Sequence, residues 1–206
     1  MKRESLEVFE EMLTSYPSLA KCKADIMRAF EIMEETYKYG KILLICGNGG
    51  SSSDAEHIVG ELMKGFKKKR RIEPNPMLDE SIRTNLSEGL PAICLSSHTS
   101  LITAIGNDSS YEMIYAQQAY AYRKLAGAIL CLSTSGNARN VNNAAITARA
   151  CRIPVIGMTG ELGGYLNSLA DVCIKVPESE TYKVQELHLP VYHCLCAMLE
   201  CEFFEN

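Results

Sequence analysis

The sequence predicts a doubly wound α/β fold with a five-stranded parallel sheet flanked by helices. Five short runs rich in Ile, Val, Leu and Cys each stop at small or polar residues, and segments of helical length lie between them. A continuous apolar run fits a strand that is buried on both faces, and alternation of such strands with helices predicts a parallel sheet. The predicted strands are 41–47, 90–96, 127–133, 153–159 and 171–176.

The segments around these strands follow in chain order. Residues 2–38 form two amphipathic helices divided near Tyr16–Pro17–Ser18, which either cover one face of the sheet or pack against another subunit. The later helices are expected at 52–70, 98–124, 137–151, 161–169 and 182–204. Pro190 should kink the last helix or delay its start, because proline clashes with the carbonyl four residues earlier.

Residues 67–89 differ from the rest of the chain. They are polar, contain Pro74 and Pro76, and show no sustained apolar period. We therefore expect an extended surface connection here, with a short helix at 78–86. The sequence contains no tandem repeat, low-complexity tract or second-domain linker, so residues 1–206 are expected to form one domain.

Composition limits the classes of function. The net charge of −4 argues against a nucleic-acid partner bound through bulk charge. One local basic run, KGFKKKRR at 64–71, could hold an anionic substrate, although such a run is more often a solvated helix end. No apolar stretch approaches the ~20 residues of a membrane span, and the acidic N-terminus is not a signal peptide.

The cysteines indicate a reducing compartment. The nine cysteines lie mostly inside apolar runs, and none forms a CxxC pair. Cys194, Cys196 and Cys201 crowd the last helix without the spacing of a zinc ribbon. We expect buried free thiols and a cytoplasmic protein, with a redox or metal role of the cysteines as the alternative.

Two loops that follow strands have similar compositions. CGNGGSSSD (46–54) and LSTSGNARN (132–140) each leave a strand through small residues and enter a helix. Backbone amides, hydroxyls and a helix N-terminus together favour an anion, here a phosphate, although capped strand-to-helix turns would have the same composition. Neither GxxxxGK[ST] nor GxGxxG occurs, so a nucleotide is not implied.

An acid/base pair follows the first loop. His57 and Glu61 share one helix face at i, i+4 and could bind a metal or act on one substrate, or form a surface pair. The segment 182–195 adds Gln185, His188 and His193. Gln185 and His193 are about 12 Å apart along a straight helix. Both could reach one ion only from a distorted helix or from two subunits.

Several of these motifs occur together in one known family. CGNGGSSSDAEH, LPAICLS, AIGNDSSY, LSTSGNARN, VIGMTGELGG, LADVCIKVP and VQELHLPVYH resemble the SIS (sugar isomerase) domain, and more narrowly the phosphoheptose isomerase family. The resemblance covers about residues 5 to 202. It implies a flavodoxin-like sheet, a homotetramer with active sites between subunits, oligomer contacts through residues 1–38, and no membrane or nucleic-acid partner.

The resemblance also implies an activity and site residues. Members of the family convert sedoheptulose 7-phosphate to D-glycero-D-manno-heptose 7-phosphate. Glu61 would be the base and His193 the partnering acid/base, and as base Glu61 would have to release the metal. One zinc ion is implied, with the ligands His57, Glu61, Gln185 and His193. Substrate and phosphate contacts are implied for Asn48, Gly49, Ser51, Asp108, Ser133, Thr134, Ser135 and Gln185.

Three positions depart from the family pattern. Ala138 replaces a serine after STSGN, Gly65 replaces an arginine four residues after Glu61, and Tyr182 replaces an aspartate three residues before Gln185. The connection 67–89 is also longer than the family suggests. These departures keep the chemical core but leave another phosphosugar open as the substrate.

Two other classes of function compete with the isomerase. One is a non-catalytic SIS protein that binds a phosphosugar and acts through a protein partner such as the replication initiator. The four ligand-type residues argue for the enzyme, because such binding proteins lose them. The other is a phosphosugar sensor fused to a DNA-binding domain, for which the chain has no helix-turn-helix candidate left over.

Overall fold

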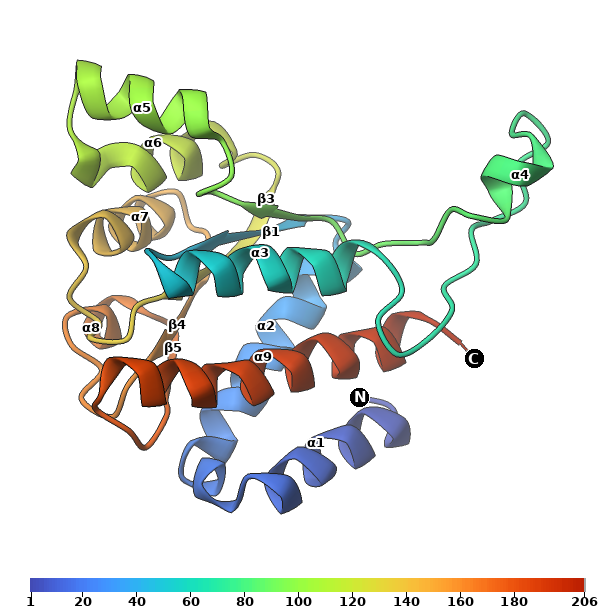
Figure 1. The fold of residues 1–206 in the computed structure, drawn as a ribbon, viewed down its shortest axis with the longest axis horizontal. Helices are drawn as coiled ribbons and strands as arrows, with labels where there is room; N and C mark the ends of the chain where they lie inside the picture. Colours follow the sequence, from blue (N-terminus) through green and yellow to red (C-terminus); the bar gives the residue numbers. More distant parts are fainter. Residues whose placement is uncertain (206) are drawn as a thin grey trace.

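The computed structural model describes residues 1–205, and its centre is a parallel sheet (Figure 1). The strands are β1 (Ile42–Cys46), β2 (Ala92–Cys94), β3 (Ala126–Leu132), β4 (Val155–Thr159) and β5 (Val172–Lys175). They lie in the order β2-β1-β3-β4-β5, with every neighbouring pair parallel. This confirms the predicted fold class. Four strands fall within the predicted apolar runs, and β3 begins one residue before its run.

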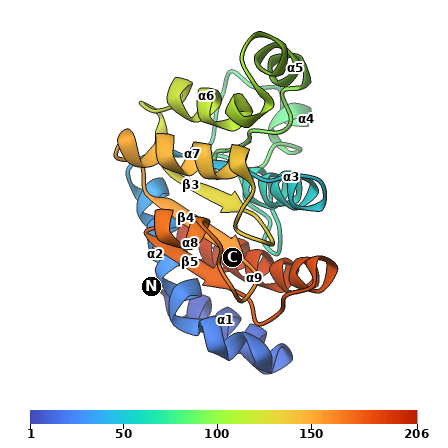
Figure 2. The ribbon, with the colours of Figure 1, turned by 90° about the vertical axis from the view of Figure 1, so that its left-hand side faces the viewer.

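Helices cover both faces of the sheet (Figure 2). One layer consists of α1 (Arg3–Ser15), the 3-10 helix η1 (Pro17–Cys22), α2 (Lys23–Lys38), α3 (Gly50–Met63) and α9 (Thr181–Phe203). The other consists of α5 (Thr99–Asp108), η2 (Tyr111–Met113), α6 (Ile114–Ala121), α7 (Arg139–Ala150) and α8 (Leu166–Leu169). Strand residues alternate between two cores, with Leu43 and Ile45 in the first and Leu44 and Cys46 in the second.

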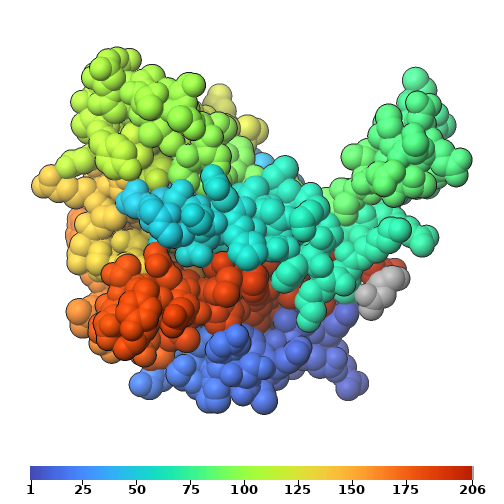
Figure 3. All heavy atoms as spheres, in the orientation of Figure 1, coloured from blue at the N-terminus to red at the C-terminus, as the bar shows by residue number. Residues whose placement is uncertain are grey.

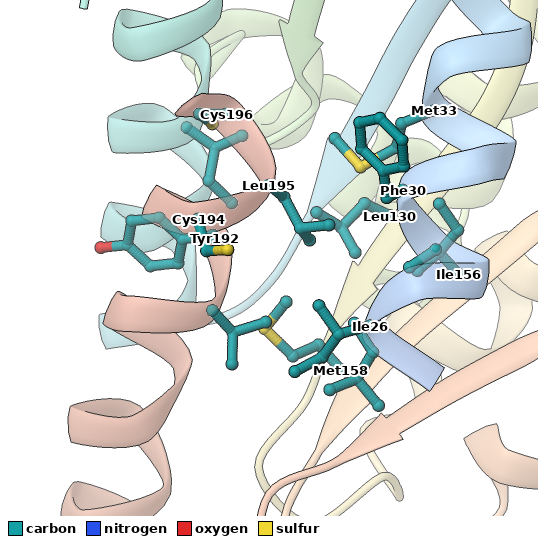
Figure 4. Packing of buried hydrophobic residues seen from close by; sticks show 14 of the residues in the cluster. Ile26, Phe30, Met33, Leu130, Ile156, Met158, Tyr192, Cys194, Leu195 and Cys196 are labelled. Carbon is teal, nitrogen blue, oxygen red and sulfur yellow. The ribbon is translucent and has the colours of Figure 1, made fainter. Parts of the chain in front are cut away.

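The N-terminal helices belong to the first core. Figure 4 shows Ile26, Phe30 and Met33 of α2 facing Leu130 and Ile156 of the sheet, with α9 across the same core from α2. The helix α1 packs along α9. Residues 1–38 were predicted either to cover a face of the sheet or to pack against another subunit. The helix α2 covers a face of the sheet.

Three predicted helices are shorter or broken. The segment 98–124 is interrupted at Ser110, whose backbone is extended, and 161–169 is helical only in α8, after Gly163 and Gly164 with positive φ. The helix α3 ends at Met63, because the chain turns extended at Lys64. Local periodicity could not locate these ends, since each is decided by loop backbone and by contacts distant in the sequence.

The last helix does not start late. The helix α9 runs from Thr181 to Phe203 and contains Pro190 in its interior, where the ring is buried. Proline removes one helical hydrogen bond. The packing of α9 against α1, α2 and α3 compensates for that loss along both halves of the helix.

Within the segment 67–89, the chain between Arg70 and Glu88 leaves the body of the molecule as an arm (Figure 3). The arm carries α4 (Glu80–Arg83), which is shorter than the predicted helix 78–86 and has no buried residue. Its base is closed where the Glu88 amide donates to the Arg70 carbonyl at 3.0 Å. The prediction of an extended surface connection is confirmed.

All nine cysteines are free thiols, and eight of them are buried. Within residues 1–205, the helices are too short or too polar to cross a bilayer.

Candidate active site

The first glycine-serine loop is built for close backbone approach. Gly49 has φ +55 and ψ −122, a conformation that favours glycine, and it precedes α3 without any side-chain cap. A Cβ on Gly47 would lie 2.5 Å from the Ser51 carbonyl oxygen. The backbone of this loop can therefore approach an anion closely at the carboxyl edge of the sheet. The Ser51, Ser52 and Ser53 amides already donate to the carbonyls of Asn48 and Gly49.

Hydrogen bonds hold this loop to the other layer. The Asn48 and Asn140 side-chain amides bond reciprocally at 2.8 Å, which ties the loop to the first turn of α7. Tyr115 Oη donates to the Gly47 carbonyl at 2.5 Å. The two candidate phosphate loops thus lie side by side.

The second loop, 133–138, is fixed by glycine contacts. Gly136 has φ +67, and a Cβ there would lie only 2.0 Å from the Gly163 carbonyl oxygen. The Gly160 amide donates to the Thr134 carbonyl at 2.9 Å. Ala138 is the N-cap of α7 and offers no side-chain acceptor, so the departure from serine removes the N-cap hydrogen bond. Asn140 Oδ1 accepts the Val141 amide at 2.9 Å instead.

Three side chains from two helices converge beside these loops. Glu61 Oε1 lies 3.2 Å from His57 Nε2, and His193 Nε2 lies 3.3 Å from the same His57 nitrogen. His57 and Glu61 come from α3, and His193 comes from α9. The sequence identified all three, but only the packing of α3 on α9 brings His193 to the pair.

This group fits a zinc ion. One nitrogen or oxygen atom from each of the three residues lies within 4.8 Å of the others. Tetrahedral ligands about 2.0–2.1 Å from zinc lie about 3.3 Å from one another, which matches the two spacings of 3.2 and 3.3 Å. In addition, Glu61 Oε2 is buried without a hydrogen-bond partner among the described residues, and Lys64 Nζ is 3.7 Å away. Two imidazoles and a carboxylate are a common zinc donor set.

Tyr192 reaches the far side of His57 and also contacts Asp54. Tyr192 Oη lies 3.1 Å from His57 Nδ1 and 3.3 Å from Asp54 Oδ1. Burial raises the pKa of Tyr192, and the Asp54 charge raises it further, so the phenol keeps its proton. Burial likewise raises the pKa of Asp54, while the bond from Tyr192 and the nearby His57 act to lower it.

His193 is adjusted toward its neutral form. Partial burial lowers its pKa, and the neighbouring His57 lowers it further, whereas Glu61 opposes the shift. A neutral imidazole can bind a metal or accept a proton near neutral pH. Phe66 packs against the ring, with the centroids 5.5 Å apart.

A buried ion pair supports the end of α3 that carries Glu61. Arg70 donates through Nε to Glu200 at 2.8 Å, and through Nη1 and Nη2 to the carbonyls of Leu62 and Glu61. Glu200 also accepts the amides of residues 66, 67 and 68. The basic run therefore does not act as one solvated surface, because Arg70 is buried.

Other predicted residues lie outside the three-residue group. The side-chain amide of Gln185 lies against Gly50, because a Cβ on Gly50 would be 2.5 Å from Gln185 Nε2. Gly50 lies two helical turns before His57 on α3. Asp108 is exposed at the end of α5 and accepts from Asn107 Nδ2 at 2.9 Å. Ser51 is buried in the first turn of α3, Ser133 is buried at the start of the second loop, and Ser135 is exposed.

Sequence reasoning did not select Asp54, Tyr192, Arg70 or Glu200. Asp54 stands inside the quoted DAEH motif, and Tyr192 precedes His193, so both were adjacent to residues that were chosen. The pairing of Arg70 with Glu200, 130 positions apart, carried no local signal.

Comparison with known proteins identifies relatives over nearly the whole chain. The family model for the SIS domain matches residues 9–160. A phosphoheptose isomerase from Trichlorobacter lovleyi is 38% identical over 185 residues, covering 90% of this chain and 86% of the relative. One from Aliarcobacter butzleri is 35% identical over 199 residues, covering 95% and 96%.

Solved structures agree with these relatives. A phosphoheptose isomerase from Neisseria gonorrhoeae aligns with a TM-score of 0.75 at 29% identity, covering 94% of this chain and 95% of that one. A phosphoheptose isomerase from Francisella tularensis aligns with a TM-score of 0.72 at 28% identity, covering 96% and 92%. This chain belongs to the SIS domain family and, within it, to the phosphoheptose isomerases, and it is an isomerase.

Proposed function

We propose that this protein interconverts sedoheptulose 7-phosphate and D-glycero-D-manno-heptose 7-phosphate at the group formed by His57, Glu61 and His193. The observation that carries the proposal is the convergence of a carboxylate and two imidazoles on α3 and α9, beside the N-termini of α3 and α7. The relatives at 38% and 35% identity are named as phosphoheptose isomerases, which supports the same substrate.

The spacing of the site suits a seven-carbon sugar phosphate. From Gly50 to His57 the helix α3 advances about 10 Å, at about 1.5 Å per residue. Single carbon–carbon bonds of about 1.5 Å advance roughly 1.25 Å each in a staggered chain, so six of them span about 7.5 Å and the phosphate extends this to roughly 10 Å. A phosphate held by Ser51, Ser133, Thr134 and Ser135 would leave the first two carbons near Glu61, and Asn48, Gly49, Asp108 and Gln185 remain candidate sugar contacts.

The reaction needs only proton movements between neighbouring atoms. Glu61 would accept the proton from the carbon next to the carbonyl, which leaves an enediolate, and would return it to the other carbon. His193, which is held toward its neutral form, would move the second proton between the two sugar oxygens. No net oxidation of the molecule results, because the carbonyl is only transferred from one carbon to its neighbour.

A zinc ion is the proposed cofactor. His57, Glu61 and His193 would hold it, with Gln185 as the fourth ligand that the family resemblance implies. When bound, zinc would polarise the carbonyl and hydroxyl oxygens of the sugar. The side chain of His57 is 43% exposed, so a neighbouring subunit could close the site. A cytoplasmic homotetramer with active sites between subunits is therefore part of the proposal, as is a single domain over residues 1–206.

Turnover of sedoheptulose 7-phosphate tests the proposal directly. We expect aldoheptose phosphate from the wild type, loss of turnover with a chelator, recovery with zinc, and no turnover from Glu61→Gln. Glu56→Gln is the matched control, because Glu56 lies exposed on the same helix and Gln can still accept the Ser97 hydroxyl. Folded wild type without turnover would refute the substrate, and turnover that resists the chelator would remove zinc from the reaction.

A further inference from the structure

Tyr192 occupies an unusual place on α9. Its ring is 2% exposed and packs in the first core, but Figure 4 shows its oxygen directed away from Leu195 and the apolar side chains of α2. The hydroxyl reaches α3, where it meets His57 Nδ1 at 3.1 Å and Asp54 Oδ1 at 3.3 Å. The buried ring therefore fixes the hydroxyl between an imidazole and a carboxylate.

The direction of these two hydrogen bonds follows from the chemistry of the partners. An ionised carboxylate only accepts hydrogen bonds, whereas a phenol can donate one and accept another. Asp54 Oδ2 is buried without a partner among the described residues, so Tyr192 is the group that satisfies this carboxylate. The phenol then donates a hydrogen bond to Asp54 and accepts one from the protonated Nδ1 of His57.

This direction determines what the other side of the imidazole presents. A neutral imidazole carries one proton, so a protonated Nδ1 leaves a lone pair on Nε2. His57 Nε2 is the atom that faces Glu61 Oε1 at 3.2 Å and His193 Nε2 at 3.3 Å. Asp54 and Tyr192 thus act on the face of His57 that is opposite to the proposed metal.

We propose that Asp54 and Tyr192 are positioning residues that hold His57 as the Nδ1-protonated tautomer and aim its Nε2 at the metal. The inference rests on the proposed metal-dependent isomerase and extends it by two residues. Outer-shell partners of this kind alter metal affinity by about 10–100-fold in other proteins. Tyr192→Phe removes the hydroxyl alone and keeps the buried ring.

The experiment compares Tyr192→Phe with Tyr37→Phe. Tyr37 is a matched control, because its ring is buried in the same core and its hydroxyl has no hydrogen-bond partner among residues 1–205. Zinc affinity is measured by competition with a chromophoric chelator. The tautomer of His57 is read from ¹⁵N–¹H correlation spectra of the metal-free proteins, with the His57 signal assigned by His57→Gln.

We expect Tyr192→Phe to weaken zinc binding about 10–100-fold and to shift metal-free His57 toward the Nε2-protonated form, while Tyr37→Phe matches the wild type. Asp54→Ala should act in the same direction, because the phenol is then free to donate to Nδ1. An unchanged His57 tautomer or an unchanged zinc affinity in Tyr192→Phe would overturn the inference. Failure of the proposed function differs from both outcomes, because the wild type would lack turnover while Tyr192→Phe still shifted the tautomer of metal-free His57.

Discussion

Replacing Glu200 by glutamine tests whether the loop after α3 depends on one buried carboxylate. Glu200 Oε1 accepts the Phe66 amide and Arg70 Nε, both at 2.8 Å, and Oε2 accepts the amides of Lys67 and Lys68 at 2.8 and 3.0 Å. Glutamine has one carbonyl oxygen, and its NH₂ group must replace the other acceptor. Whichever way the amide turns, two of the four donors meet another donor.

The expected loss of stability follows from these contacts. Each buried donor left without an acceptor costs about 1–3 kcal/mol, and removing one partner of a buried ion pair typically costs about 3–5 kcal/mol. The two figures overlap, because Arg70 Nε is one of the donors. The side chains of Arg70 and Glu200 are 0% and 1% exposed, so solvent offers no replacement. We therefore expect Glu200→Gln to lower the free energy of unfolding by at least about 3 kcal/mol.

Urea unfolding measures this loss, and Glu186→Gln is the control, because Glu186 lies exposed on the same helix. Adding Arg70→Met to Glu200→Gln should cost less than the sum of the single changes, since the double variant leaves no buried unpaired charge. A loss below about 1 kcal/mol in Glu200→Gln, compared with the control, would refute the reasoning from acceptor number and burial.

Two other changes test the second loop and the core. Gly136→Ala should destabilise the protein by at least about 2 kcal/mol and raise KM for the sugar phosphate, because alanine is strained at φ +67 and its Cβ would meet the Gly163 carbonyl at 2.0 Å. Urea unfolding and steady-state kinetics check it against Gly60→Ala, whose Cβ meets nothing within 4 Å, and equal losses would contradict it. Burial lowers the pKa of His188 to about 4 from an ordinary 6.5, and the Thr159 backbone opposes only part of that shift. The unfolded chain therefore binds a proton at higher pH than the folded one, so stability should fall by about 3 kcal/mol as pH drops from 6.5 to 4. His188→Leu should reduce this fall in urea unfolding followed across that range, and an unchanged pH profile would contradict the assignment.

The positions of the five strands along the chain could be predicted from the sequence, because each strand is buried on both faces and appears as an unbroken apolar run. The glycine-serine loops were also visible, since strand ends and small residues are local features. Helix ends were not. The helix α3 ends at Met63, and beyond it Ser87 accepts the Gly65 amide and Glu200 accepts the Phe66 amide. The helix α9 continues through Pro190 because residues on both sides of the proline are buried.

The same division holds for the site. The sequence predicted that His57 and Glu61 lie close together, because residues four apart are about one helical turn apart and share one face. The sequence also identified His193 and Gln185 as candidate ligands, but it could not predict how far they lie from that pair. Parallel packing of α9 along α3 sets His193 against His57 and Gln185 against Gly50. That packing depends on contacts more than 100 positions apart, which no local pattern encodes. Sequence alone determined which chemical groups this protein carries and on which elements. Only the tertiary structure decided which of them meet, because side-chain distances between helices are set by the shared core.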